Sequence, residues 1–129
     1  MKLAVLGTGK IVQEFLPMIQ QVTDVELVAL LSTPRSLYKA KEMQAQYHIQ
    51  EVYTDYETLL SNATIDTVYV ALPNHLHYQY TKAALLQGKN VICEKPFTLN
   101  AHQCPTTFLW IKGWENLAFF KSIITRRIL

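Results

Sequence analysis

The sequence has 129 residues; half are hydrophobic, and 12 basic against 10 acidic side chains leave a formal net charge of +2. This length is enough for one domain with a buried core and excludes a second full domain. The balanced charge argues against a nucleic-acid-binding surface. The chain shows neither a secretory leader nor an apolar stretch of about 18 residues, so we expect a cytoplasmic protein without a membrane span, whose two cysteines are reduced.

Short apolar segments alternate with segments of helical periodicity from the N-terminus onward. The predicted strands cover residues 3–6, 26–31, 52–53, 66–72 and 90–93. The predicted helices cover residues 11–21, 37–47, 55–60 and 75–87. Since strands that alternate with helices form parallel sheets through right-handed crossovers, the sequence predicts an α/β fold: a doubly wound, mainly parallel, Rossmann-like sheet with helices on both faces.

Three residues are expected to shape the helix boundaries. Pro17 lies inside the first predicted helix and should kink or shorten it. Ser36 has a side chain suited to capping the second helix, and Gly88 is suited to ending the fourth. After about residue 103 the pattern becomes irregular, although residues 117–124 have the composition of a sixth strand.

The turn after the first predicted strand contains Gly7-Thr8-Gly9 and leads directly into the first helix. In nucleotide-binding turns of this type, the first glycine permits a tight turn, and the second lets backbone N–H groups approach a pyrophosphate at the helix N-terminus. The third glycine of G-x-G-x-x-G would fall at position 12, where this chain has Val12. By itself, the motif fits a nucleotide site and an ordinary strand–helix turn equally well.

Four polar stretches follow predicted strands, at residues 7–9, 32–35, 71–77 and 94–97. The carboxyl ends of parallel strands share one edge of the sheet, and doubly wound folds bind ligands at that edge. The four stretches are therefore expected to meet there, which strengthens the nucleotide interpretation of the glycine turn.

His75 and His77, with Cys93 nearby in the predicted sheet, have the donor types of a metal site. At the start of a helix, however, the two histidine side chains diverge, and no further ligand has suitable spacing. We expect no metal site.

Two of these stretches carry a family resemblance. Glu94-Lys95-Pro96 resembles the E-K-P signature of the Gfo/Idh/MocA oxidoreductases, and residues 73–77 (Pro-Asn-His-Leu-His) resemble the motif that precedes it in that family. The resemblance covers residues 1 to about 103. It implies a dinucleotide-binding Rossmann domain over residues 1–103, followed by a divergent C-terminal segment, 104–129.

The resemblance also implies roles for individual residues. Lys95 would lie beside the nicotinamide and assist proton transfer, while hydride moves between the cofactor and a sugar, polyol or related carbinol or carbonyl substrate. A lysine that is partly desolvated near a cationic ring is suited to acid–base work. Glu94 would hold Lys95 in place, and His77 would lie near the cofactor. The residues expected to bind the cofactor are Gly7, Thr8, Gly9, Lys10, Ile11, Ser32, Thr33, Arg35, Leu72, Pro73, Asn74, His77, Glu94 and Lys95.

The end of the second predicted strand bears on the choice between NAD and NADP. An acidic residue at this position binds the adenosine ribose and favours NAD. Here the position falls near Ser32, and Thr33 and Arg35 follow it, a set that could accommodate a 2′-phosphate. The sequence leans slightly towards NADP and leaves NAD open.

Members of the resembled family are substantially longer and carry a second, substrate-binding domain. In this sequence no Asp follows Asp66, and after His77 the only histidine is His102, so the substrate-binding Asp and His of that domain have no counterpart. Two hypotheses follow. The chain is the cofactor half of an oxidoreductase, which acts on a small molecule when a substrate domain is supplied, or it is a non-catalytic dinucleotide-binding or dimerising module, including a truncated inactive fragment.

Overall fold

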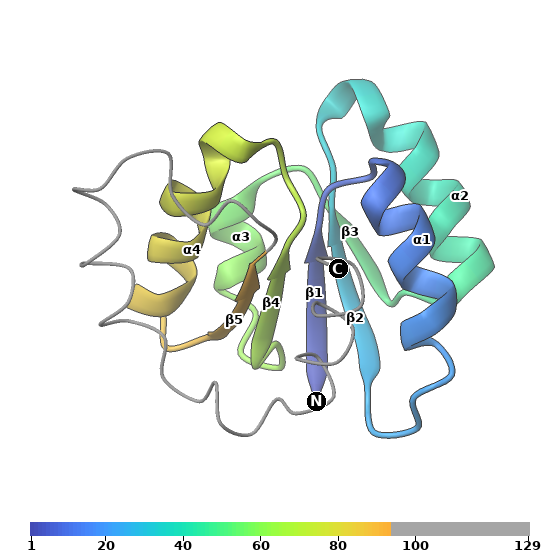
Figure 1. The fold of residues 1–129 in the computed structure, drawn as a ribbon, viewed down its shortest axis with the longest axis horizontal. Helices are drawn as coiled ribbons and strands as arrows, with labels where there is room; N and C mark the ends of the chain where they lie inside the picture. Colours follow the sequence, from blue (N-terminus) through green and yellow to red (C-terminus); the bar gives the residue numbers. More distant parts are fainter. Residues whose placement is uncertain (94–129) are drawn as a thin grey trace, which may run out of the picture.

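Strand β1 (Lys2–Leu6) forms the centre of a five-stranded parallel sheet in the computed structural model, which describes residues 1–93. The order of the strands is β3-β2-β1-β4-β5, and every neighbouring pair is parallel. The remaining strands are β2 (Glu26–Leu31), β3 (Glu51–Tyr53), β4 (Thr67–Val70) and β5 (Asn90–Cys93). The chain returns to the other side of β1 after β3, so the switch in strand order lies between β1 and β4 (Figure 1).

Helices cover both faces of this sheet, as the sequence predicted. The α-helices are α1 (Lys10–Ile19), α2 (Leu37–Tyr47), α3 (Tyr56–Leu60) and α4 (His77–Leu86). Two short 3-10 turns, η1 (Pro34–Ser36) and η2 (Asn74–Leu76), lead into α2 and α4. In Figure 1, α1 and α2 lie together on one side of the view, and α3 and α4 lie on the other.

Alternate side chains of β1 belong to two separate hydrophobic clusters. Leu3 and Val5 pack with the buried residues of α1 and α2, whereas Ala4 and Leu6 pack with those of α3 and α4. Successive side chains of a strand point to opposite faces, so a strand covered on both faces must be apolar throughout. This explains why β1 and β2 read as nearly continuous apolar runs.

Helix α1 is fixed over the switch point by its buried side chains. The ring of Phe15 stacks on the ring of Tyr69 in β4, with their centroids 4.2 Å apart. Val12, at the position of the missing third glycine, is fully buried in the same cluster. A β-branched side chain therefore makes the contact between helix and strand at this point, and the N-terminus of α1 faces the carboxyl end of β1.

The element boundaries differ from the predicted ones by a few residues. Helix α1 includes Pro17 but ends at Ile19 rather than at residue 21. Strand β4 covers Thr67–Val70 rather than 66–72, and the helix predicted over 75–87 is divided into η2 and α4. Gly88 has a φ of +77° and its N–H donates to the Leu85 carbonyl (3.0 Å), which confirms it as the residue that ends α4.

Within residues 1–93, no helix has the length and apolar character needed to cross a membrane. The predicted strand at 117–124 and the segment 104–129 lie outside the described residues.

Candidate functional site

Gly7 is a glycine because the fold requires one there. Its φ is +111°, and a Cβ atom on it would lie 2.8 Å from the carbonyl oxygen of Ala71. Its N–H donates to the carbonyl of Leu31 (2.9 Å), which ties the turn to the end of β2. Both the backbone conformation and the close approach of the β4 end exclude a side chain.

Gly9 occupies a different environment two residues later. It is the N-cap residue of α1 and has ordinary extended backbone angles (φ −75°, ψ −175°). A Cβ atom on it would meet no atom of the described residues within 4 Å. Residues 1–93 therefore leave open space beside Gly9, next to the first-turn N–H groups of α1, which have no acceptor within the helix.

A cavity of about 710 Å³ opens beside this turn, at the carboxyl ends of β1, β2 and β4. This volume is within the range of roughly 300–1,000 Å³ that small-molecule sites occupy. The predicted cofactor residues that line it are Gly7, Thr8, Gly9, Lys10, Ile11, Ser32, Thr33, Leu72, Pro73 and Asn74. The structure therefore brings together three of the four polar stretches that the sequence placed at one edge of the sheet.

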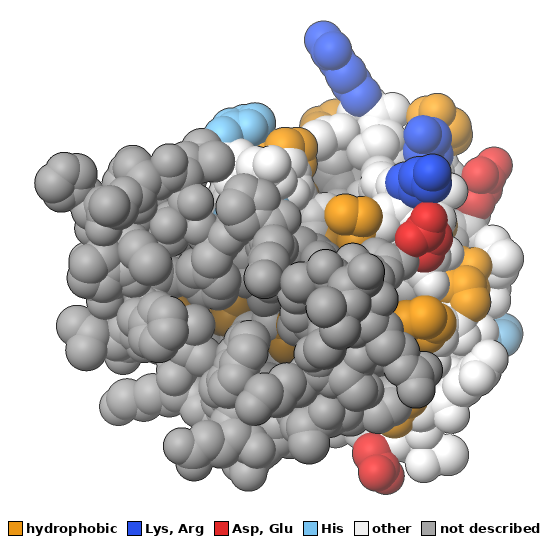
Figure 2. Space-filling view, in the orientation of Figure 1, with side chains coloured by type: hydrophobic (Ala, Val, Ile, Leu, Met, Phe, Trp, Pro, Cys, Tyr) orange, Lys and Arg blue, Asp and Glu red, His pale blue; other side chains and the backbone are white. Residues whose placement is uncertain are grey.

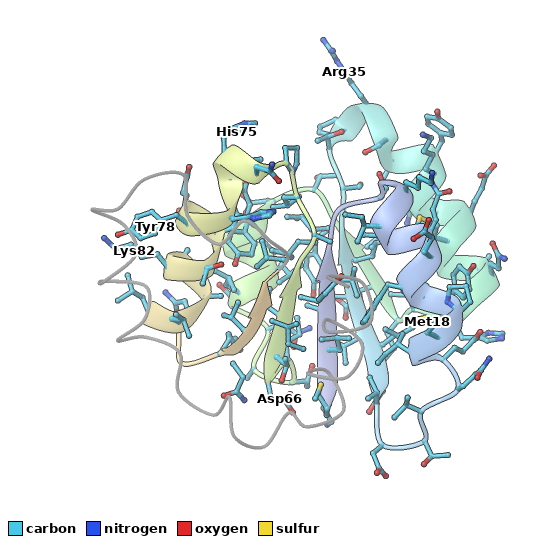
Figure 3. All side chains as sticks on the ribbon, viewed as in Figure 1. Met18, Arg35, Asp66, His75, Tyr78 and Lys82 are labelled. Carbon is cyan, nitrogen blue, oxygen red and sulfur yellow. The ribbon has the colours of Figure 1, made fainter. Side chains whose placement is uncertain are left out.

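Other predicted site residues do not line the cavity. Arg35 is exposed, and its side chain points away from the sheet in Figure 3. His77 is buried behind the wall of the cavity, and its neighbour His75 is exposed, so the two histidines face different environments. Glu94 and Lys95 lie outside the described residues.

The residue after β2 carries a buried hydroxyl group beside the cavity. Ser32 is only 6% exposed, and its Oγ atom has no hydrogen-bond partner within the described part of the chain. Its backbone N–H is occupied, because it donates to the carbonyl of Tyr53 (2.8 Å). Ser32 lines the cavity, and its buried hydroxyl is costly to the fold as long as it has no partner.

Thr33 and Ser36 cap the turn that follows β2. The Ser36 N–H donates to the Thr33 hydroxyl and the Thr33 N–H donates to the Ser36 hydroxyl, each at 3.2 Å. The expectation that the Ser36 side chain caps α2 is therefore wrong: it occupies the N-cap position of α2, but its hydroxyl bonds back to Thr33. The capping box holds η1 rigidly at the mouth of the cavity.

Two tyrosines line the cavity on the side of α3 and α4, and the sequence analysis did not identify them. The rings of Tyr56 and Tyr80 stack with centroids 4.6 Å apart, and the Tyr56 hydroxyl donates to the Tyr80 carbonyl (2.7 Å). Tyr56 follows the end of β3 by three residues, a position that could have been counted with the other strand ends. The pair gives the cavity an aromatic wall.

The charge around the cavity favours an anion. Among residues 1–93, Lys10 is the only charged side chain that lines it, and α1 has no acidic residue in its first turn. Figure 2 shows basic side chains gathered at the end of the molecule where α1 and α2 begin. A helix N-terminus with a nearby lysine and no carboxylate is suited to a phosphate group. No group of three or more His, Cys, Asp or Glu side chains in the described residues could hold a metal ion.

The order of the strands, the glycine turn and the anion-favouring cavity at the switch point define a dinucleotide-binding domain of the Rossmann class. Comparison with known proteins is more specific. The model of the oxidoreductase family GFO_IDH_MocA, NAD-binding Rossmann fold, matches residues 1–112. The chain belongs to this family, and it is the NAD(P)-binding domain of a Gfo/Idh/MocA oxidoreductase.

Curated relatives of the chain include dehydrogenases. It is 32% identical over 102 residues to scyllo-inositol 2-dehydrogenase (NADP(+)) IolU of Bacillus subtilis, with 79% of this chain and 30% of that protein covered. It is 35% identical over 109 residues to D-xylose 1-dehydrogenase (NADP(+)) 2 of Haloferax volcanii, with 84% of this chain and 33% of that protein covered. The chain thus spans about a third of the length of these relatives.

Solved structures agree with this assignment. The 3-ketoreductase KijD10 of Actinomadura kijaniata, in complex with NADP and TDP-benzene, superposes with a TM-score of 0.78 at 30% identity, over 86% of this chain and 34% of that one. An apo scyllo-inositol dehydrogenase of Lactobacillus casei gives a TM-score of 0.76 at 26% identity, over 86% of this chain and 33% of that one.

Proposed function

We propose that this chain binds NADP in the cavity and forms the cofactor half of an enzyme that transfers hydride between the nicotinamide and a sugar, polyol or related carbinol or carbonyl substrate. The observation that carries the proposal is the open space beside Gly9 at the N-terminus of α1. The described residues do not fill that space, and a pyrophosphate would fit the N–H groups and the positive end of the helix there.

The proposed cofactor contacts fall into three groups. Gly7–Ile11 cradle the pyrophosphate, with Lys10 adding a positive charge at the helix start. Ser32 and Thr33, at the end of β2, hold the adenosine ribose. Leu72–Asn74, at the end of β4, form the opposite wall of the crevice.

The preference for NADP rests on the chemistry at the end of β2. Ser32 lines the cavity and has a buried hydroxyl without a hydrogen-bond partner among residues 1–93, and no carboxylate of these residues lines the cavity. A carboxylate at this position would accept hydrogen bonds from the free ribose of NAD and would repel a 2′-phosphate. Arg35 is exposed on η1, three residues after Ser32, and its flexible side chain could reach a phosphate that binds there. Two curated relatives bear NADP(+) in their names.

The chemical step is assigned to Lys95, with Glu94 as the group that holds it. Hydride transfer to or from a carbinol carbon requires the hydroxyl proton to leave or arrive, and the ammonium of a lysine can supply that proton to a carbonyl oxygen. The cofactor supplies the hydride. These two roles rest on the E-K-P motif and on its position directly after β5.

Titration of the purified chain with NADPH and with NADH, followed by nicotinamide fluorescence, tests the proposal. We expect NADPH to bind at least about fivefold more tightly than NADH, equivalent to about 1 kcal/mol. Ser32→Asp should reverse this preference, because the new carboxylate would repel the 2′-phosphate. The control Ser32→Ala adds no charge and should weaken the binding of both cofactors similarly. A chain that binds neither cofactor would overturn the assignment of the cavity, and a preference for NADH in the wild type would overturn the choice of NADP alone.

A further inference from the structure

His77 holds the β4 wall of the cavity without lining the cavity itself. It is the first residue of α4, its side chain is 1% exposed, and its Nε2 atom lies 2.7 Å from the carbonyl oxygen of Leu72. A carbonyl can only accept a hydrogen bond, so the imidazole Nε2 must carry the proton and donate. This hydrogen bond joins two residues that are five apart in the sequence, and it links the beginning of the loop between β4 and α4 to the first residue of α4.

The residue held by this bond packs against the glycine turn. A Cβ atom on Gly7 would lie 3.5 Å from the Cδ2 atom of Leu72 and 2.8 Å from the oxygen of Ala71. Two further backbone hydrogen bonds lie on either side: the Ala71 N–H donates to the Leu6 carbonyl (3.2 Å) and the Leu76 N–H donates to the Pro73 carbonyl (2.9 Å). Leu72 and Gly7 both line the cavity, and the His77 hydrogen bond restrains the backbone of Leu72 beside the glycine turn.

We propose that His77 is a positioning residue, which keeps Leu72–Asn74 in the shape that accepts the dinucleotide and does not touch the dinucleotide itself. The inference rests on the proposed cofactor binding, and it replaces the direct cofactor contact that the sequence predicts for His77. Without the imidazole, the Leu72 carbonyl loses a buried donor and the loop gains alternative conformations. The apparent Kd then rises in inverse proportion to the fraction of chains whose loop is still binding-competent.

Three variants of the full 129-residue chain test this role by NADPH titration, with urea unfolding measured in parallel. His77→Phe fills the volume without a donor, and we expect it to raise the Kd about tenfold. His77→Gln places an amide donor at a comparable distance and should restore most of the affinity. The control Ala84→Gly, two turns further along the buried face of α4, should lower stability and leave the Kd unchanged.

The possible results separate this inference from the proposed function. If the wild type binds no dinucleotide, the proposed function falls and this inference falls with it. If the wild type binds and His77→Phe binds equally well, only the positioning role is overturned. Should His77→Phe fail to fold, His77→Asn takes its place, since its amide is one bond too short to reach Leu72. Equal Kd values for His77→Asn and His77→Gln would then overturn the inference, and weaker binding by His77→Asn would support it.

Discussion

At the scale of single residues, Gly7 and Gly9 differ in what a side chain would meet. At Gly7, a methyl group would be placed at a φ of +111° and 2.8 Å from the Ala71 carbonyl oxygen. We expect Gly7→Ala to lower the free energy of unfolding by about 1–3 kcal/mol, because the backbone must move or remain strained. Urea denaturation of the two proteins, monitored by circular dichroism, measures the difference.

Gly9→Ala is the matched comparison within the same turn. Its added methyl group meets no described atom within 4 Å, so the cost to stability should stay within about 1 kcal/mol, the range of N-cap substitutions. Its effect should appear in binding: the methyl group occupies the space proposed for the pyrophosphate and should raise the Kd for NADPH. Unchanged affinity for Gly9→Ala would contradict the placement of the pyrophosphate.

At the scale of elements, α3 is a five-residue helix with one side-chain cap. The carboxylate of Asp55 accepts hydrogen bonds from the hydroxyl and the backbone N–H of Thr58, the latter at 3.0 Å. These bonds hold the pKa of the Asp55 carboxyl below its ordinary value. Helix α3 supplies Tyr56 to the cavity wall, so this cap also fixes one side of the candidate site.

The cap gives a testable dependence of stability on pH. A carboxyl with a lowered pKa in the folded state stabilises the fold above its unfolded pKa and loses that contribution as the pH falls through the folded value. We expect wild type to be more stable than Asp55→Asn at about pH 7, and the difference to shrink as the pH is lowered to about 3. An asparagine side chain can also cap the helix but does not titrate, so this comparison isolates the contribution of the Asp55 charge to stability. A difference in urea midpoint that is constant over this pH range would contradict the expectation.

The elements themselves were predictable because their signals are local. Continuous apolar runs identified the buried strands, and Gly88 marked the end of α4. The hydrogen-bond partner of the Ser36 side chain and the two 3-10 turns were not predicted. The Ser36 hydroxyl can bond to an N–H of the helix that follows it or to Thr33 before it, and in the structure it bonds to Thr33. Pro17 lies on the exposed side of α1, where the helix continues for two residues beyond it.

The candidate site was predictable to the extent that strand ends define it. Counting from each strand end found the cavity residues around Gly7, Ser32 and Leu72. Tyr56 follows the end of β3 and could have been counted in the same way, but Tyr80 lies inside α4, and its contact with Tyr56 joins two helices that are distant in sequence. The sequence motif identified His77 as a residue near the cofactor. Its 1% exposure and its hydrogen bond to Leu72, which only the structure shows, favour a role in positioning the loop over direct contact with the cofactor.

At the scale of the whole molecule, the described residues form the candidate cofactor cavity, and none of the residues that line this cavity is a carboxylate. Asp66 is the last aspartate of the sequence, and it lies at the opposite edge of the sheet from Arg35 and His75 (Figure 3). There its carboxylate accepts the Lys2 N–H at 3.1 and 3.2 Å. Asp66 therefore serves the fold, and the acid–base role proposed above is assigned to Lys95.

This arrangement predicts cofactor binding without efficient turnover by the 129-residue chain alone. The chain spans 30% of the inositol dehydrogenase relative and 33% of the xylose dehydrogenase relative. Hydride transfer requires the substrate carbon to be held against the nicotinamide, and well-oriented reactants gain roughly 7–11 kcal/mol over free encounter. We expect the chain to bind NADPH but to leave polyols, sugars and their carbonyl forms unchanged above background.

The measurement is the absorbance of NADPH, which would form from NADP⁺ with polyols and sugars and would be consumed with their carbonyl forms, and Lys95→Ala is the control. Equal, background rates for the wild type and Lys95→Ala, together with tight NADPH binding by both, would agree with a cofactor half that needs a substrate domain. Turnover by the wild type that Lys95→Ala abolishes would contradict the prediction, because these 129 residues would then hold both the cofactor and the substrate. That result would also place Lys95 in the chemical step, since a lysine that only bound the cofactor would change the Kd as well as the rate.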